Sequence, residues 1–138
     1  MALSDYSSEL IATAQSLATP GKGILAVDES TKTVGKRLGS IGVENTEANR
    51  QAYRGMLFTA AGLGDFISGA ILYEETLFQN HADGESMVSK LGKLGIIPGI
   101  KVDMGLRPLV GAGSVETLCT GLDAVSYTHL RAHETSQN

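Results

Sequence analysis

Apolar residues follow two different spacings along the chain, and each spacing predicts a different element. Helices are predicted where apolar residues recur every three or four positions, at about residues 10–18, 47–60 and 87–94. Strands are predicted where apolar residues form short unbroken runs, at residues 23–28, 67–73 and 96–103. Because helices and strands alternate, the sequence predicts an α/β fold with a parallel sheet covered by helices.

The predicted elements also carry recognisable start and stop residues. Thr46 precedes the second helix in the position of an N-cap, and Pro20 with Gly21 ends the first helix. Gly95 lies where a C-terminal helix glycine is expected. Gly62–Gly64 is expected to be a loop that ends the second helix.

Charged side chains gather at or just after the end of each predicted strand. They are Asp28 with Glu29, Glu74 with Glu75, and Lys101 with Asp103. In barrels and in doubly wound sheets, ligands bind at the edge where parallel strands end. On a strand, Lys101 and Asp103 would point to the same side, so a cation and an acid are expected to face one site.

Composition narrows the kind of partner. The 138 residues carry a net charge of −4, which argues against general nucleic-acid binding, and a single cysteine, which fits a reducing compartment. No apolar run is long enough to cross a membrane. His129 and His133 could share a helix face, but the remaining histidine, His81, is expected in a loop, so no metal site is predicted.

One segment suggests a phosphate ligand. The glycine-lysine pairs lack the following Ser or Thr of a phosphate-binding loop, and the Gly62–Ile67 stretch lacks a dinucleotide fingerprint. Residues 28–37, however, place an acid, hydroxyls and two cations after a strand, which suits a phosphorylated polyol. The alternative interpretation is a capped helix with a solvated basic face.

Four segments of the sequence resemble class I fructose-bisphosphate aldolase of the plant or algal type. They are GKGILAVDES, KRLGSIGVENTEANR, GAILYEETL and GIKVDMG, within a similarity from about residue 8 to Asp123. The resemblance implies a (β/α)8 TIM barrel, of which the chain holds the N-terminal helix and about three βα units. It also implies reversible cleavage of fructose 1,6-bisphosphate to dihydroxyacetone phosphate and glyceraldehyde 3-phosphate through a lysine Schiff base, without metal or cofactor. A homotetramer in the cytoplasm or a plastid, acting in glycolysis, gluconeogenesis or carbon fixation, is expected.

The resemblance also assigns roles to residues. It implies that Asp28 contacts substrate hydroxyls and handles protons, and that Lys101 is an active-site cation. The residues expected to bind substrate, mainly its phosphate, are Ser30, Thr33, Arg37 and Arg50. Met104 stands where the family usually has lysine.

The resemblance places the Schiff-base lysine and the paired glutamates on later strands, and no lysine here matches that nucleophile. The chain alone is therefore expected to be inactive. The alternatives are an inactive truncated chain, a weak sugar-phosphate-binding fragment, or a different phosphosugar barrel such as an isomerase.

The last fifteen residues, 124–138, differ in character from the rest. The similarity stops after Asp123, and the string VSYTHLRAHET resembles one reading frame of a transposon-end adapter used in preparing sequencing libraries. Residues 1–123 are therefore interpreted as aldolase barrel and residues 124–138 as a non-native tail. A natural divergent terminus is the alternative.

Overall fold

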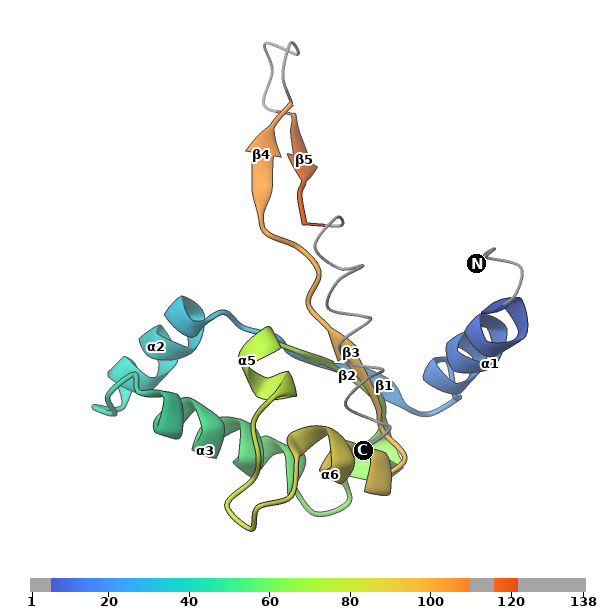
Figure 1. Ribbon diagram of the computed structural model, residues 1–138, viewed down its shortest axis with the longest axis horizontal. Coiled ribbons are helices and arrows are strands. Elements are labelled where there is room, and N and C mark those ends of the chain that lie inside the picture. Colours follow the sequence, from blue (N-terminus) through green and yellow to red (C-terminus); the bar gives the residue numbers. More distant parts are fainter. Residues whose placement is uncertain (1–5, 110–115, 122–138) are drawn as a thin grey trace. The chain divides into compact units, whose positions relative to one another are not determined.

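Three parallel strands form the sheet in the first part of the chain (Figure 1). The computed structural model describes residues 6–109 and 116–121, and the chain divides into two units after Ile100. The strands are β1 (Gly23–Val27), β2 (Ile67–Leu72) and β3 (Ile97–Ile100), in the spatial order β1-β2-β3. Val27 pairs with Leu72, and Leu72 pairs with Ile100, so all three strands end at one edge. The predicted parallel α/β sheet is confirmed.

The helices of the described residues connect these strands. They are α1 (Ser7–Leu17), α2 (Thr31–Ser40), α3 (Glu47–Phe58), α4 (Leu63–Phe66), α5 (Glu74–Leu77) and α6 (Met87–Lys93). The three predicted helices are α1, α3 and α6. The expected loop at Gly62–Gly64 is wrong in part, because Gly62 adopts a left-handed conformation (φ 73°) that starts the short α4. Across the described ranges, each helix is too short or too polar to cross a membrane.

Serine and threonine side chains begin three of the helices, which explains where these helices start. Thr46 accepts a hydrogen bond from the Asn49 N–H at 3.2 Å, and Ser86 accepts one from the Ser89 N–H at 3.1 Å. Each bond satisfies a backbone donor that has no partner within the first helical turn. The predicted N-cap at Thr46 is confirmed.

A glycine turn links α6 to β3, as the sequence predicts. Gly95 has a φ of 70°, which favours glycine. Its N–H donates to Gly92 O, and the Ile96 N–H donates to Leu91 O, both at 2.9 Å. This is the Schellman pattern of bonds, and the two apolar residues that it brings together, Leu91 and Ile96, are both buried. The turn therefore sets the point at which β3 begins.

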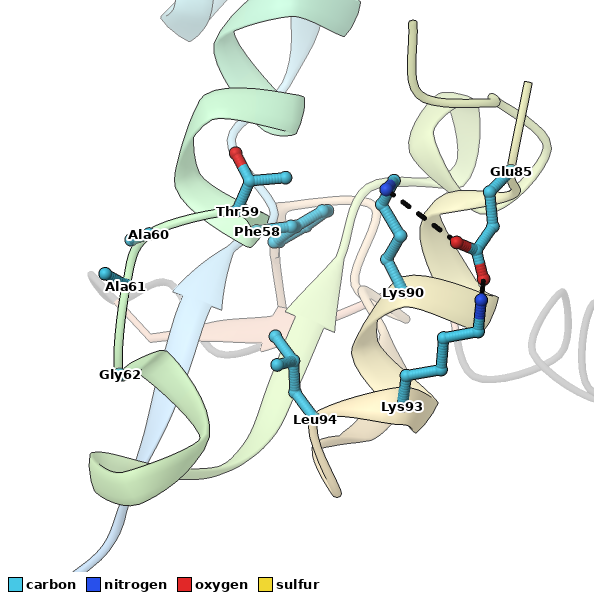
Figure 2. Close-up of a pocket in the computed structure, with 9 residues that line it drawn as sticks. All are labelled: Phe58, Thr59, Ala60, Ala61, Gly62, Glu85, Lys90, Lys93 and Leu94. Carbon is cyan, nitrogen blue, oxygen red and sulfur yellow. Dashed lines mark ion pairs between the residues drawn. The ribbon is translucent and has the colours of Figure 1, made fainter. Parts of the chain in front are cut away.

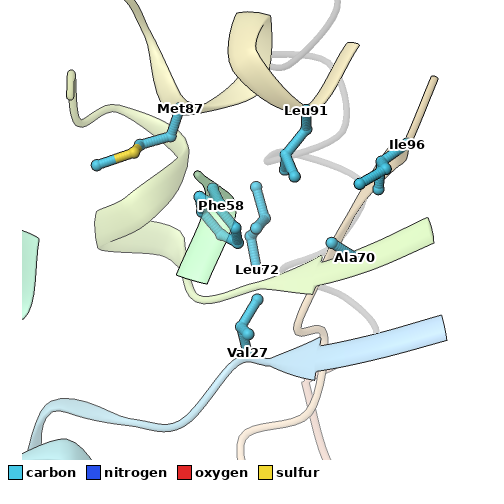
Figure 3. Close-up of a cluster of buried hydrophobic side chains, with 7 residues drawn as sticks. All are labelled: Val27, Phe58, Ala70, Leu72, Met87, Leu91 and Ile96. Carbon is cyan, nitrogen blue, oxygen red and sulfur yellow. The ribbon is translucent and has the colours of Figure 1, made fainter. Parts of the chain in front are cut away.

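The core lies between the sheet and helices α3 and α6 (Figure 3). Its buried members are Val27, Phe58, Ala70, Leu72, Met87, Leu91 and Ile96. Phe58 comes from the end of α3 and lies beside Leu72 of the central strand, and Met87 and Leu91 of α6 lie over the same face of the sheet (Figure 3). β2 is thus the strand on which most of the packing depends.

Two apolar patterns proved more exposed than expected. β1 was expected to be buried on both faces, but Ile24 is 53% exposed and Ala26 is exposed, whereas Val27 is buried. Successive strand residues point to opposite faces, and helices α3 and α6 cover the face that carries Val27. On α3, Met56 is exposed, because the helix turns the face with Arg54, Gly55 and Phe58 inward.

The second unit contains two short strands that the sequence analysis missed. β4 (Leu106–Pro108) pairs antiparallel with β5 (Thr117–Cys119), with Arg107 opposite Leu118. Each has three exposed residues, so neither produces an alternating or continuous apolar pattern. β3 also ends at Ile100, three residues earlier than predicted. Lys101 and Asp103 therefore follow the strand and do not lie on it.

The core position of Leu72 predicts a large difference between two substitutions in the sheet. Leu72→Ala should lower the free energy of unfolding by about 2–5 kcal/mol, because it leaves a cavity at a site with 0% exposure. The control Ile24→Ala, at a position that is 53% exposed, should change it by about 0.5 kcal/mol or less. Urea unfolding followed by circular dichroism measures both values. Equal losses would contradict the assignment of the covered face.

Candidate functional site

The candidate site begins where β1 and β2 end, because the register brings their last residues side by side. Asp28 follows Val27, and Tyr73 follows its partner Leu72. Asp28 is half-buried at this edge, and Glu29 comes directly after it. The polar residues after the first two strands therefore lie at a common edge of the sheet, as predicted.

Ser30 and Thr33 are brought together by the first turn of α2. Ser30 is the N-cap, and its Oγ accepts a hydrogen bond from the Thr33 N–H at 3.4 Å. The two hydroxyl oxygens lie 3.2 Å apart. The capped helix of the alternative interpretation is thus present, although Arg37 on that helix is paired with Glu29. It remains compatible with ligand binding, because the two hydroxyls stay clustered beside the first N–H groups of the helix.

A chain of charges connects α2 to α3 through Glu29. One carboxylate oxygen of Glu29 pairs with Arg37 and the other pairs with Arg54. Arg54 also donates from Nη2 to the Glu29 carbonyl at 2.8 Å, and its side chain is only 3% exposed. Arg37 is 55% exposed and also donates to the Tyr53 hydroxyl at 3.0 Å. The buried arginine thus holds Glu29, and Glu29 in turn holds the exposed arginine.

The charges in this chain shift the pKa values of its members. Partial burial raises the pKa of Glu29, but the hydrogen bond from Arg54 and the charges of Arg54 and Arg37 outweigh it and hold the pKa below its ordinary value of 4.5. The hydrogen bond to Tyr53 and the charge of Glu29 raise the pKa of Arg37. Glu29 is therefore ionised at neutral pH, and Arg37 stays a cation.

Arg50 belongs to a second ion pair at the start of α3. Its Nε and Nη2 donate to the Glu75 carboxylate at 2.8 to 3.1 Å, and Nη1 donates to Asn45 Oδ1 at 3.0 Å. The hydrogen bond to Glu75 is the main cause that raises the pKa of Arg50. Gln79 also donates to Glu75, at 3.3 Å. Arg50 is thus tied to α5 by a bidentate pair.

Lys101 lies in the second unit, where it forms an ion pair with Asp103. The hydrogen bond from Lys101 lowers the pKa of Asp103. The Met104 N–H donates to Thr120 O at 2.7 Å, which joins this segment to the residue after β5. The prediction that both residues lie on a strand is wrong, because β3 ends at Ile100, but the cation and the acid do lie together as an ion pair.

Apart from Asp28, the predicted site residues make four separate sets of contacts. Ser30 and Thr33 touch each other, Arg37 and Arg50 each pair with a different glutamate, and Lys101 pairs with Asp103. The sequence analysis did not identify Tyr53 and Arg54 as part of the site. Arg54 lies four residues after Arg50, so both arginines share one face of the helix. This spacing, together with the acids after two predicted strands, was the signal that could have identified Arg54.

A hollow of about 320 Å³ lies at the opposite ends of the strands (Figure 2). It is formed by the end of α3, the loop before α4, and α6, and these segments precede β2 and β3. Its two cations, Lys90 and Lys93, both pair with Glu85, at 3.7 and 2.7 Å. The hydrogen bond from Lys90 also lowers the pKa of Asp83 to about 2. The positive charge of this hollow is therefore already balanced by acids. In the residues that the structure describes, no group of three His, Cys, Asp or Glu side chains could hold a metal ion.

A parallel sheet with charged side chains after its strand ends defines an α/β protein of the kind that binds polar ligands at that edge. A family model described as "Glycolytic: Fructose-bisphosphate aldolase class-I" matches residues 9–135. The chain therefore belongs to the class I fructose-bisphosphate aldolase family. The predicted family is confirmed.

Individual relatives agree with this assignment. The chain is 58% identical to chloroplastic fructose-bisphosphate aldolase 2 of Arabidopsis thaliana over 125 residues, which cover 91% of this chain and 31% of the relative. It is 58% identical to the chloroplastic aldolase of Spinacia oleracea and 56% identical to the cytosolic aldolase 7 of A. thaliana, each over 123 residues, which cover 89% of this chain and 31% and 34% of the relatives. The chain thus spans about a third of the length of these relatives.

A solved structure shows the same fold. Fructose-bisphosphate aldolase from Plasmodium falciparum, solved in complex with TRAP and a small-molecule inhibitor, superposes with a TM-score of 0.86 at 49% identity. The match covers 94% of this chain and 37% of that chain. The predicted aldolase barrel fold is therefore confirmed, and the described residues contribute the three parallel strands β1 to β3 to it.

The Glu29 ion pairs predict a pH-dependent contribution to stability. Glu29→Gln should lower the free energy of unfolding at pH 7 by about 3 kcal/mol, because it leaves the buried Arg54 without its charged partner. Since the pKa of Glu29 is lower in the folded chain, this contribution is present above pH 4.5 and is lost as pH falls through the lowered pKa. Urea unfolding between pH 3 and 7 measures the difference. Glu74→Gln, at an exposed position, is the control and should show little effect at any pH.

Proposed function

We propose that the protein to which this chain contributes cleaves fructose 1,6-bisphosphate reversibly to dihydroxyacetone phosphate and glyceraldehyde 3-phosphate. The observation that carries the proposal is the 58% identity to chloroplastic fructose-bisphosphate aldolase over 125 residues. The site supports it, because hydroxyls of Ser30 and Thr33 and a cationic Arg37 follow the same strand end as Asp28. These are groups that suit a phosphorylated sugar.

Each predicted residue takes one role in this reaction. Asp28 accepts a proton from a substrate hydroxyl near the C3–C4 bond, and Lys101 supplies a positive charge that favours the anionic substrate. The phosphate is bound by Ser30, Thr33 and Arg37. Arg50 is the remaining substrate ligand. Its Nε and Nη2 are engaged by Glu75, so it contacts substrate by exchanging that carboxylate for a phosphate.

The nucleophile of the proposed reaction is the Schiff-base lysine, which the family resemblance places on a later strand of the barrel. No lysine in this chain matches it. The neutral amine of the Schiff-base lysine adds to the C2 carbonyl, and the adduct takes up a proton and loses water to form an iminium ion. The C3–C4 bond then breaks as the 4-hydroxyl loses its proton, and the electron pair moves into the iminium. The imine is thus the electron sink, and the reaction requires no metal or cofactor. The 138-residue chain alone is then inactive, and the alternative is an inactive or weakly sugar-phosphate-binding chain.

In this proposal, location follows the relatives, and assembly follows what the family resemblance implies. The complete protein forms a homotetramer, acts on sugar phosphates and binds neither nucleic acid nor membranes. It operates in a chloroplast or in the cytosol, the two compartments named for the relatives, within glycolysis, gluconeogenesis or carbon fixation.

The barrel part is proposed to end near Asp123, with residues 124–138 as a non-native tail. These residues lie outside the part of the chain that the structure describes. The family-model match runs to residue 135 and therefore does not support a boundary at Asp123. The proposal rests only on the similarity of residues 124–135 to a translated adapter sequence.

A chimeric enzyme tests the proposed catalytic roles. Residues 1–123 of this chain replace the matching part of the S. oleracea chloroplastic aldolase, and cleavage of fructose 1,6-bisphosphate is assayed. The chimera should be active, and Asp28→Asn should lower kcat by about 100-fold or more, because a proton-transfer group is lost. Lys101→Met should raise KM.

The matched control for the chimera is Lys93→Met, which lies at the other end of the strands and should leave both constants unchanged. Cooperative folding without cleavage would refute the proposed function for this segment. Full kcat in Asp28→Asn would refute the role of that residue alone.

Resequencing tests the proposed tail. Independently prepared genomic DNA across codons 120–138 should lack the adapter triplets and continue in an open frame beyond codon 123. The same codons in genomic DNA would show that residues 124–138 are natural, and the alternative of a short, inactive chain would then be favoured.

A further inference from the structure

The guanidinium of Arg37 is held by acceptors from two different elements. The Glu29 carboxylate reaches it from the end of β1, and the Tyr53 hydroxyl reaches it from α3, at 3.0 Å. A long, half-exposed arginine side chain has many accessible rotamers, and two acceptors from separate elements reduce that freedom. Arg37 is therefore fixed although its side chain is 55% exposed.

Both contacts use the same nitrogen of Arg37. Glu29 and Tyr53 each accept from Nη1, and in the described part of the chain no hydrogen bond from Nε or Nη2 is found. These two nitrogens form the edge of a guanidinium that binds a carboxylate or phosphate with two parallel hydrogen bonds. Arg50 shows the contrasting case, because its Nε and Nη2 already bind Glu75.

Glu29 is itself rigidly placed by Arg54. The buried guanidinium of Arg54 binds both the carboxylate and the backbone carbonyl of Glu29. The ring of Tyr53 lies 5.3 Å from the Arg54 guanidinium carbon. Two arginines and one glutamate leave a net charge of 2 − 1 = +1 in this cluster, so the cluster still attracts an anion.

We propose that Tyr53 and Glu29 are positioning residues that hold Arg37 by Nη1 so that its Nε and Nη2 edge receives a phosphate group. This inference rests on the proposed function, in which Arg37 contacts a substrate phosphate. Tyr53 and Glu29 act through Arg37 and do not contact the substrate.

Binding of fructose 1,6-bisphosphate to the 15N-labelled 138-residue chain tests the inference. The Nε–Hε signal of Arg37 should shift on titration, and Tyr53→Phe should weaken binding about three- to tenfold, because one hydrogen bond to a charged group is lost. This variant leaves the formal charge unchanged. Tyr6→Phe, on an exposed residue at the start of α1, is the control and should bind like the unmodified chain.

The variant Glu29→Gln tests the same inference in the same binding experiment. Removing a negative charge would by itself strengthen anion binding, so weaker binding in this variant supports positioning and stronger binding argues against it. If Glu29→Gln does not fold, Tyr53→Phe decides, because Tyr53 is not part of the buried Arg54 and Glu29 pair. Urea unfolding of every variant separates lost affinity from lost folding.

The Arg37→Met background distinguishes positioning from a general structural role. There, adding Tyr53→Phe should cause no further loss of affinity, whereas a structural role would persist. If Arg37→Met weakens binding and Tyr53→Phe does not, the inference is overturned while the role of Arg37 stands. If Arg37→Met binds normally, or the unmodified chain does not bind, the inference fails, and turnover by the chimera still tests the proposed function separately.

Discussion

The buried ion pair between Arg54 and Glu29 is the constraint on which the arrangement after β1 depends. An arginine that is 3% exposed requires a charged acceptor, and Glu29 provides both its carboxylate and its carbonyl. The backbone just after Asp28 is thereby fixed to α3. The capping Ser30 at the start of α2 is the next residue after Glu29, so its position is fixed as well.

Arg37 and Arg50 differ in how far their charges are satisfied. The Nε and Nη2 of Arg50 bind Glu75 and so join α3 to α5. Among the described contacts, Arg37 is bound only through Nη1. Both arginines looked alike in the sequence as cations near strand ends. Arg50 must therefore release Glu75 before its Nε and Nη2 can bind another anion, whereas the same two nitrogens of Arg37 have no partner among the described contacts.

The sequence predicts the strands and helices better than it predicts which residues pack against them. Apolar runs, the cap at Thr46 and the glycine at position 95 act locally, so β1 to β3, α3 and α6 could be predicted with their order and direction. Exposure of Ile24 and the pairing of Arg54 with Glu29 depend on which segments come together in space, 25 residues apart for the ion pair. The strands β4 and β5 were missed because three exposed residues each give no periodic pattern.

The turn at Gly95 and the polar residues after β1 lie at opposite ends of one sheet. The turn and the core beneath it determine where the strands start and how they pack, while Asp28 to Arg37 only follow their ends. Apart from Glu29, which pairs with the buried Arg54, the segment after β1 can therefore change its side chains while Leu72, Phe58 and Leu91 remain packed. Ligand preference can thus change at this edge of the sheet without a change of the core beneath it.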